Sequence, residues 1–397
     1  MSVDGPSAKP VHRPDHPQSV GYTRAKRAVF FDQGQPLALE AGGRLSPVEI
    51  EYETYGRLSP SKDNAILICH ALTGDAHAAG WDQSPEGPLR GYRKDKPGWW
   101  DEVIGPGKPV DTRRFFVICA NVLGSCYGST GPMSLNPATG RPYGLSFPVV
   151  TVGDWAKTSF LLLDRLGIDS LYAVVGGSMG GQQALEMALD WPDRVRRLII
   201  LSAAGRITAQ GLSFNSVARH SIAGDPNFNG GDYYGGPPPL KGLAAARMLA
   251  HITYLSEESM GCKFGRRLQD KNTPDFTLTG VEFEVESYLK HQGESFVRRY
   301  DANSYLYITR AMDYYDAAVW GEGDMVKAAS RILARTLVVS FSSDWLFPPE
   351  LCRELVAAMC RSGRPVTYVD VPSRYGHDAF LVETETVSRL LDSFLKN

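Results

Sequence analysis

One stretch of the sequence limits the fold more than any other. Val174 to Gly181 is an apolar run that ends in a serine flanked by glycines, and Gly176, Ser178 and Gly180 match the pattern Gly-x-Ser-x-Gly. In a nucleophile elbow, a buried strand turns sharply into a helix and leaves the serine hydroxyl exposed above the sheet, while the glycines let neighbouring backbone pack closely. The pattern alone is weak evidence, because glycine and serine also form ordinary turns.

The residues around this serine have the composition that an elbow requires. Leu171 to Val175 is a short run that suits a buried parallel strand, and Gln182 to Leu189 is helical in composition before Trp191-Pro192. The sequence therefore predicts a strand, a turn and a helix in this order, with Ser178 as the nucleophile.

The composition is that of a large globular protein. The chain has 397 residues, 43% hydrophobic and 22% charged, so it can bury a large core, and we expect one α/β domain with an insertion. The formal net charge of -2 gives no reason to expect nucleic acid or an anionic membrane as a partner. No apolar run approaches the roughly 18 residues that span a bilayer, and the N-terminus lacks the apolar segment of a signal peptide, so we expect a cytoplasmic protein.

Six cysteines are scattered along the chain without the spacing of metal ligands, and three of them lie in or beside apolar runs. We therefore expect buried free thiols and no metal site. The cysteines are Cys69, Cys119, Cys126, Cys262, Cys352 and Cys360.

Changes of pattern divide the chain into four predicted parts. Residues 1–25 carry much proline, histidine and serine without apolar periodicity, which is typical of a flexible N-terminal arm. Strand and helix patterns alternate over 26–210 and return over 331–397, as expected for two parts of one α/β core. Residues 211–330 lack this alternation and combine Gly/Pro loops with helical stretches, which predicts a helical cap inserted between late strands of the sheet.

Strand patterns predict a mostly parallel central sheet with an antiparallel edge. Val48 to Tyr55 alternates apolar and polar residues, which suits antiparallel strands with one wet face. In the cap, helices are expected at Leu243 to Leu255 and at Ser295 to Met312. Apolar runs indicate buried strands at Ala65 to Cys69, Phe115 to Cys119 and Arg197 to Ser202, and the core is expected to resume at Thr336 to Phe341 and at Val366 to Val371.

The first of these buried strands runs directly into the loop His70 to Gly74. Loops at the carboxyl ends of central strands hold the ligand site of an open α/β sheet. Such a loop supplies one backbone N–H group of an oxyanion hole, and the residue after the nucleophile supplies the other. We therefore expect Leu72 and Met179 to form the oxyanion hole through their backbone, and His70 to hold the loop.

Two further polar residues follow the two late strands. Asp344 comes just after the first of them and His377 after the second, which is the order Ser, acid, His of an α/β-hydrolase fold. His377 would take the proton of Ser178, and Asp344 would fix the imidazole tautomer and stabilise the cation that forms. Asp344 could instead cap the helix near Pro349, and His377 could be a loop histidine, but both positions are those that the fold requires. We therefore predict a triad of Ser178, Asp344 and His377.

A triad does not choose its reaction, since this fold carries esterases, lipases, peptidases and acyltransferases. Seven stretches together make the chain resemble the homoserine O-acetyltransferase family of methionine biosynthesis over nearly its whole length beyond the N-terminal arm. They are His70 to Gly74, Asn121 to Pro132, Gly176 to Ala184, Gly211 to Asn215, Ala246 to Met248 with His251 to Tyr254, Phe341 to Pro349, and Gly376 to Leu381.

The resemblance implies a ping-pong reaction that needs no bound cofactor, with acetyl-CoA as co-substrate and L-homoserine as acceptor. It also implies that Arg247 from the cap binds the α-carboxylate of the amino acid and that Asp378 binds its ammonium group. A planar guanidinium and a carboxylate suit these partners. Arg247 could also be an exposed helix charge, and Asp378 could cap the next turn. The family further leads us to expect a homodimer.

Three alternative reactions remain open on the same scaffold. Relatives that use succinyl-CoA tend to carry arginine just past the Asp-Trp pair, where this chain has Leu346, and an apolar residue there favours acetyl-CoA. Serine instead of homoserine as acceptor differs by one methylene, which changes discrimination by only about 1 to 3 kcal/mol. The triad could also act as an esterase-type serine hydrolase if water reached the acyl-enzyme.

Overall fold

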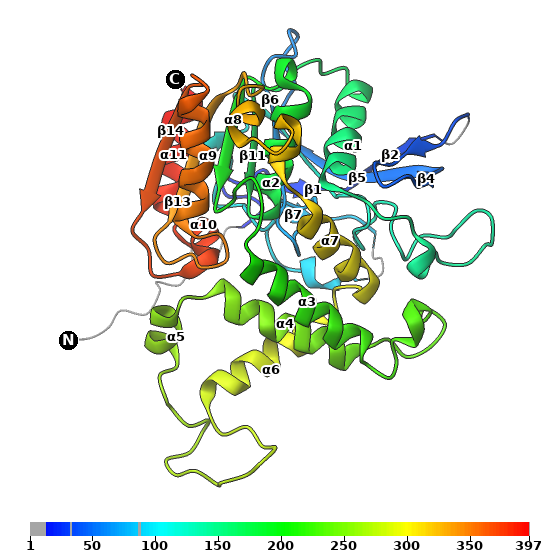
Figure 1. Cartoon of the computed structure of the whole chain (residues 1–397), viewed down its shortest axis with the longest axis vertical. Coiled ribbons are helices and arrows are strands. Elements are labelled where there is room, and N and C mark those ends of the chain that lie inside the picture. The colour runs from blue at the N-terminus through cyan, green and yellow to red at the C-terminus, as the bar shows by residue number, and fades with distance from the viewer. Residues whose placement is uncertain (1–12, 32–33, 86–88, 397) are drawn as a thin grey trace.

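The computed structural model describes residues 13–31, 34–85 and 89–396, and a sheet of eight strands lies at its centre (Figure 1). Counted across the sheet from β14 to β10, six strands run parallel, while β5 pairs antiparallel with both β10 and β2. The predicted α/β-hydrolase fold with a mostly parallel sheet is confirmed. Across the sheet the strands are β14 (Val366–Val371), β13 (Arg335–Phe341), β12 (Arg197–Leu201), β11 (Ala173–Gly177), β6 (Ala65–Cys69), β10 (Phe116–Ala120), β5 (Val48–Tyr55) and β2 (Lys26–Phe30).

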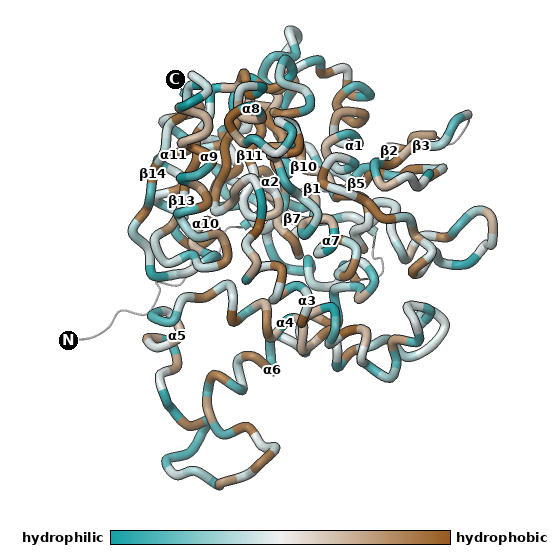
Figure 2. Tube along the Cα trace, viewed as in Figure 1, coloured by the Kyte–Doolittle hydropathy of each residue, from teal (hydrophilic) through white to brown (hydrophobic). Residues whose placement is uncertain are grey.

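Helices cover both faces of this sheet and bury an apolar core on each. Side chains alternate between the faces along a strand, so Leu67 of β6 belongs to one core while Ile66 and Ile68 belong to the other. Both faces are therefore apolar, and the central strands form the hydrophobic interior of the molecule (Figure 2). The first core contains α1 (Val152–Arg165), α2 (Met179–Asp190), α8 (Met325–Ala329) and α9 (Pro349–Arg361), and the second contains α11 (Thr384–Lys396).

The chain between β12 and β13 forms most of a helical layer at the carboxyl end of the sheet. In Figure 1 this layer lies below the sheet, and α7 connects it to the core. Helix α3 packs against α4 and α7, and α4 packs against α6. The predicted divisions of the chain at 210 and 330 stay predictions. The helices are α3 (Ala209–Ala223), α4 (Leu240–Tyr254), α5 (Glu257–Lys263), α6 (Glu284–Phe296) and α7 (Ala302–Tyr314).

The single helix that we predicted from Ser295 to Met312 is wrong, because the chain leaves the helical path between α6 and α7. Asp301 is the N-cap of α7, and its carboxylate accepts a hydrogen bond from the backbone N–H of Ser304 at 2.8 Å. The same carboxylate is buried and accepts the hydroxyl of Tyr233 at 2.6 Å. An N-cap with these partners starts a new helix, whatever the helical composition of the residues before it.

The wet face that we expected for β5 is covered. Glu51 and Glu53 are fully buried, because the segment after β6 folds over them and supplies cations. Arg90 forms an ion pair with Glu51, and His77 contacts Glu53 at 3.2 Å. Buried carboxylates need such partners, since an isolated buried charge is very costly.

The predicted N-terminal arm falls partly outside the described residues, which begin at residue 13. Its last part is held: β1 (Tyr22–Thr23) pairs in parallel with β7 (Trp81–Asp82), and the backbone N–H of Ala25 donates to Ser84 at 2.7 Å. These hydrogen bonds hold a segment that we predicted to be flexible from its composition alone. Of the predicted buried cysteines, Cys262 and Cys360 are exposed, and the other four are buried.

The remaining elements are short. They are β3 (Leu37–Ala38), β4 (Arg44–Leu45), β8 (Ile104–Gly105), β9 (Val110–Asp111) and α10 (Ala379–Val382), with single 3-10 turns between longer elements. None of the helices in the described ranges has the length and apolar character needed to span a membrane.

Candidate active site

Ser178 occupies the turn between β11 and α2, as the glycine pattern predicted. Its backbone has φ 55° and ψ -126°, a left-handed conformation that is strained for a residue with a side chain. A Cβ atom at Gly176 would collide with the carbonyl of Gly180, and one at Gly180 would collide with the carbonyl of Cys69. The two glycines are therefore required for the close approach of strand and helix that holds Ser178 in place.

Three predicted side chains from distant parts of the chain meet in one series of hydrogen bonds. His377 Nε2 lies 2.8 Å from Ser178 Oγ, and His377 Nδ1 lies 2.8 Å from Asp344 Oδ2. The other oxygen of Asp344 accepts the backbone N–H groups of Leu346 and Phe347 at 3.0 and 2.9 Å. All three side chains are buried. The two backbone N–H groups hold the carboxylate of Asp344 in place.

The surroundings of His377 set its proton affinity. Burial by itself lowers the pKa of His377, but the negative charge and the hydrogen bond of Asp344 outweigh it, and the pKa is raised above 6.5. The ring of Phe347 stacks on the imidazole with centroids 5.5 Å apart. His377 is thus held in one orientation and favoured as an acceptor of a proton from Ser178.

Both predicted oxyanion residues lie near the serine. Met179 is the first residue of α2, and Leu72 lies in the loop after β6 and lines the same cavity as Ser178. Within the described residues, neither of their backbone N–H groups donates a hydrogen bond to a protein acceptor. Both are therefore free to donate to a bound oxygen. His70 holds the loop, as expected: it is buried, and its Nδ1 lies 2.8 Å from the carbonyl of Ala71.

Arg247 and Asp378 are near enough to interact electrostatically, since each charge shifts the pKa of the other group. Arg247 extends from α4, where its Nη1 lies 3.4 Å from the hydroxyl of Thr73 and its guanidinium carbon lies 5.6 Å from the ring centroid of Tyr254. Its Nε is buried without a hydrogen-bond partner, and no carboxylate of the described residues lies within ion-pair distance. Burial lowers the pKa of Arg247 and raises that of Asp378, so each charged form lacks full compensation.

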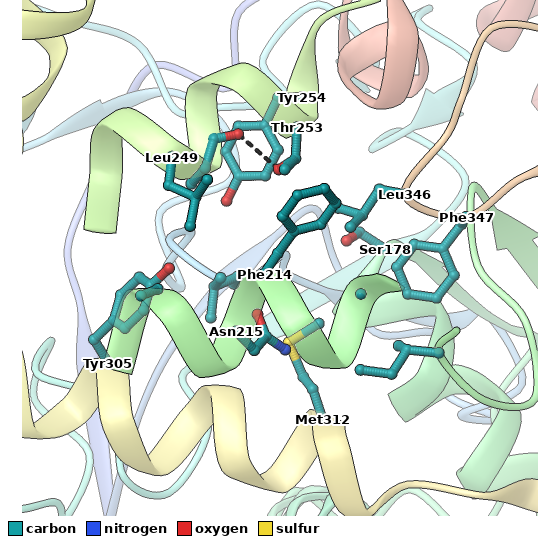
Figure 3. A pocket seen from close by; sticks show the side chains of 15 residues that line it. Ser178, Phe214, Asn215, Leu249, Thr253, Tyr254, Tyr305, Met312, Leu346 and Phe347 are labelled. Carbon is teal, nitrogen blue, oxygen red and sulfur yellow. Dashed lines mark hydrogen bonds between the residues drawn. The ribbon is translucent and has the colours of Figure 1, made fainter. Parts of the chain in front are cut away.

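The cavity above Ser178 is small and mostly apolar. Its volume is about 40 Å³. Figure 3 shows side chains of α3, α4 and α7 closing it from the cap side, while Leu346 and Phe347 close it from the loop after β13. The labelled side chains are Ser178, Phe214, Asn215, Leu249, Thr253, Tyr254, Tyr305, Met312, Leu346 and Phe347.

Two cap residues near the site were missed by sequence reasoning. The hydroxyl of Tyr300 donates to the carbonyl of Leu72 at 3.0 Å, and Nη1 of Arg299 donates to the carbonyl of Thr73 at 3.1 Å. Both therefore hold the loop that carries Leu72, one of the two predicted oxyanion residues. They lie in the break between α6 and α7, in residues that we predicted to be part of one helix. Only evidence of the break itself would have pointed to them.

Comparison with known proteins places the chain in a family. The model of the alpha/beta hydrolase fold family matches residues 64–384. A homoserine O-acetyltransferase of Methanohalobium evestigatum is 50% identical over 96% of this chain and 75% of its own length. A homoserine O-succinyltransferase of Halorhodospira halophila is 49% identical over 95% of this chain and 94% of its own length.

Two solved structures are similar to this chain at lower sequence identity. Homoserine O-acetyltransferase from Bacillus anthracis is 28% identical, with a TM-score of 0.85 over 95% of this chain and 98% of that chain. The structure of esterase E22 is 31% identical, with a TM-score of 0.82 over 94% of this chain and 100% of that chain. By fold, by the extent of the match and by identity, the chain belongs to the homoserine O-acetyltransferase family within the α/β hydrolases.

Proposed function

We propose that this protein transfers an acetyl group from acetyl-CoA to the hydroxyl of L-homoserine through an acyl-serine. The observation that carries the proposal is the pair Arg247 and Asp378, whose opposite charges interact with each other near His377 but lack full compensation. A plain hydrolase needs only the triad and an oxyanion hole. A cation and an anion at one end of the site match the carboxylate and ammonium groups of an amino acid.

In the first half of the reaction, Ser178 attacks the thioester carbonyl of acetyl-CoA. His377 Nε2 takes the hydroxyl proton as the new C–O bond forms, and Asp344 stabilises the imidazolium. The negative oxygen of the tetrahedral intermediate would accept the free N–H groups of Leu72 and Met179. The C–S bond then breaks, His377 returns the proton to the leaving sulfur, and CoA departs with its thiol protonated.

In the second half, the γ-hydroxyl of homoserine attacks the acetyl-serine. His377 takes the proton of this hydroxyl, the same oxyanion hole holds the second intermediate, and the proton goes to Ser178 Oγ as the acyl C–O bond to the enzyme breaks. Arg247 and Asp378 would hold the amino acid by its carboxylate and ammonium, which brings the hydroxyl into line. The reaction needs no bound cofactor, because every proton moves through His377.

The acetyl donor is favoured over succinyl by the space and chemistry above Ser178. At about 10 to 15 Å³ for each water, the volume of about 40 Å³ corresponds to about three waters, comparable with an acetyl group. A succinyl group adds a carboxylate that would need a cation. The loop after β13 places the apolar side chain of Leu346 in the cavity wall and supplies no positive charge there. Because similar proteins include a homoserine O-succinyltransferase, the assay compares both acyl donors.

The experiment measures thiol release from acetyl-CoA by the purified protein, with and without L-homoserine, beside parallel reactions with succinyl-CoA and with L-serine. The proposal predicts strong release that requires homoserine, with O-acetylhomoserine as the product by mass spectrometry. Equal release without any amino acid would contradict it and would indicate a hydrolase, as for the similar esterase. Faster release from succinyl-CoA would correct the donor, and faster release with serine would correct the acceptor.

The amino-acid anchor is tested separately with Asp378→Asn, which keeps the size of the side chain and removes its charge. We expect the KM for homoserine to rise about 10- to 100-fold, since hydrogen bonds to charged groups contribute about 1.5 to 3 kcal/mol. The KM for acetyl-CoA should stay unchanged. An unchanged KM for homoserine would show that Asp378 does not hold the ammonium group.

We also propose a cytoplasmic homodimer. The lack of an apolar segment long enough to cross a membrane supports the location. Exposed apolar side chains on the cap support self-association through it, namely Leu212 and Val217 of α3 and Ile252 of α4. Light scattering coupled to size-exclusion chromatography would measure the mass, and a mass of 43.5 kDa would indicate a monomer instead.

A further inference from the structure

Asp344 and His377 come from two different loops, and a serine outside the triad joins these loops. Ser343 directly precedes Asp344 in the loop after β13. Its hydroxyl accepts the backbone N–H of Gly376, which directly precedes His377, at 2.9 Å. The acid and the base are thus linked twice, once by their own side chains at 2.8 Å and once through the residue before each of them.

Gly376 is the point at which the loop of His377 could rotate. Its φ of 69° lies in the left-handed region, where glycine turns with little steric cost. A Cβ atom there would lie 2.6 Å from the backbone nitrogen of Ser256, so the close approach to the chain after α4 leaves no room for a side chain. In the part of the chain that the structure describes, the N–H of Gly376 has no hydrogen-bond partner other than Ser343. Ser343 therefore limits a rotation that would displace His377.

The base of the same loop is held separately. The hydroxyl of Ser342 donates to the carbonyl of Ser373 at 3.1 Å and accepts its backbone N–H at 3.0 Å. The backbone N–H of Ser342 also donates to the carbonyl of Val371, at the end of β14, at 3.0 Å. These three bonds do not involve Ser343, so loss of its hydroxyl would free the residues next to His377 without releasing the loop from the sheet.

We propose that Ser343 is a positioning residue, which keeps the imidazole of His377 in line with both Ser178 and Asp344. The inference rests on the function proposed above, in which these three residues form the acyl-serine, and it adds a residue that acts through the backbone of Gly376. The contacts of His377 with its two partners are 2.8 Å each, so they leave little tolerance for a shift. A misplacement of about 1 Å can cost about 10²-fold in rate.

Three variants test this role. Ser343→Ala removes the hydroxyl, and Ser343→Thr keeps it. Ser84→Ala is the matched control, because Ser84 is also half-buried and its hydroxyl accepts the backbone N–H of Ala25, from a distant segment, at 2.7 Å. The assay measures release of p-nitrophenolate from p-nitrophenyl acetate in the first turnover, with the enzyme in excess and over a range of pH. This step reports acylation of Ser178 and needs neither CoA nor homoserine.

We expect Ser343→Ala to slow acylation by about 5- to 20-fold, a part of the cost of a full 1 Å misplacement. The charged groups that act on His377 are Asp344 and Asp378, and a weaker contact with Asp344 lowers the pKa of His377. The acid limb of the pH–rate profile should therefore move to lower pH. Ser343→Thr should keep both the rate and the limb. Ser84→Ala should keep them too, while the two alanine variants lower the melting temperature by a similar few degrees.

Three results would overturn the inference. The first is an unchanged rate in Ser343→Ala, and the second is an equal slowing in Ser84→Ala. The third is a slower rate in Ser343→Ala with the acid limb in place, because a general loss of stability slows the reaction without changing the contact between His377 and Asp344.

The first-turnover assay also separates this inference from the proposed function. If the protein transferred no acetyl group to homoserine, slower acylation and a shifted acid limb in Ser343→Ala alone would still support Ser343 as a positioning residue. If transfer stood and Ser343→Ala acylated at the rate of the unmodified protein, only this inference would fail.

Discussion

Replacing Tyr300 by phenylalanine tests how the cap supports the chemistry. The change removes one hydroxyl, which donates to the carbonyl of Leu72 at 3.0 Å, and leaves the ring stacked on Phe296 at 4.9 Å between centroids. The carbonyl and the N–H of Leu72 belong to successive planar peptide units that share one Cα atom, so a movement of one unit shifts the other. Loss of this hydrogen bond therefore frees the oxyanion loop to tilt the N–H of Leu72 away from the reacting oxygen.

Two magnitudes follow from this hydrogen bond. A buried carbonyl left without a donor costs about 1 to 3 kcal/mol of stability, so the melting temperature should fall by a few degrees. Complete loss of one oxyanion donor costs about 10²- to 10³-fold in kcat. The N–H of Leu72 is displaced and not deleted, so we expect a smaller loss of about 3- to 30-fold. The KM for homoserine should not change, because Tyr300 contacts neither Arg247 nor Asp378 in the hydrogen-bond network.

Steady-state kinetics and thermal denaturation measure both effects, with Tyr307→Phe as the matched control. The hydroxyl of Tyr307 also joins the cap to the core, at the carbonyls of Phe147 and Leu145, but it does not touch the oxyanion loop. The control should lose stability and keep kcat. If Tyr300→Phe lowered the melting temperature equally and also kept kcat, the hydrogen bond would be structural only, and the reasoning about the loop would be refuted.

Three further changes test other parts of the structure. Asp344→Asn removes the charge that raises the pKa of His377, so burial should take that pKa below 6.5; the acid limb of the kcat/KM profile should move to lower pH while the plateau falls about 10³- to 10⁴-fold. An acid limb that stays in place would show that Asp344 does not set this pKa. Leu346→Arg should raise the preference for succinyl-CoA over acetyl-CoA by about 5- to 10-fold, the size of one ion pair near water, and an unchanged ratio of kcat/KM would speak against this position. Burial raises the pKa of Glu186 to about 7 despite the hydrogen bond from Trp320, so the folded state favours the protonated form and stability falls as pH rises from about 4.5 to 7. Glu186→Gln should therefore stabilise the protein by about 2 to 4 kcal/mol at pH 8 and by little at pH 4.5, as measured by denaturant unfolding.

The order of strands and loops was the part of the structure that could be predicted from the sequence. Ser178 and Asp344 follow buried apolar strands, and His377 follows the edge strand β14, so local pattern sufficed to put them at one end of the sheet. The 2.8 Å contacts of His377 with both partners have the geometry that the predicted roles require. The roles themselves remain for kinetics to test.

The features that could not be predicted from the sequence depend on tertiary contacts. Glu51 and Glu53 sit in an alternating strand that suggests a wet face, but they are buried under a segment whose cations lie far along the chain. Asp301 starts a helix inside a run of helical composition because buried partners fix its carboxylate. Tyr233 and the cations beside Glu51 and Glu53 lie far from these carboxylates in the sequence, so neither composition nor periodicity could reveal them.

The cap is bonded to the loops that carry the chemistry, and this bears on why transfer can win over hydrolysis. Tyr300 and Arg299 hold the carbonyls of the oxyanion loop, and the indole N–H of Trp345, next to Asp344, donates to the carbonyl of Leu255 at the end of α4 at 3.0 Å. In the proposed mechanism, a cap fixed at both loops would keep water from the acyl-serine without having to close after each donor binds. Selectivity for homoserine would then depend on Arg247 and Asp378, because an acceptor held at two charged groups would attack as an intramolecular nucleophile and outcompete the few waters that enter.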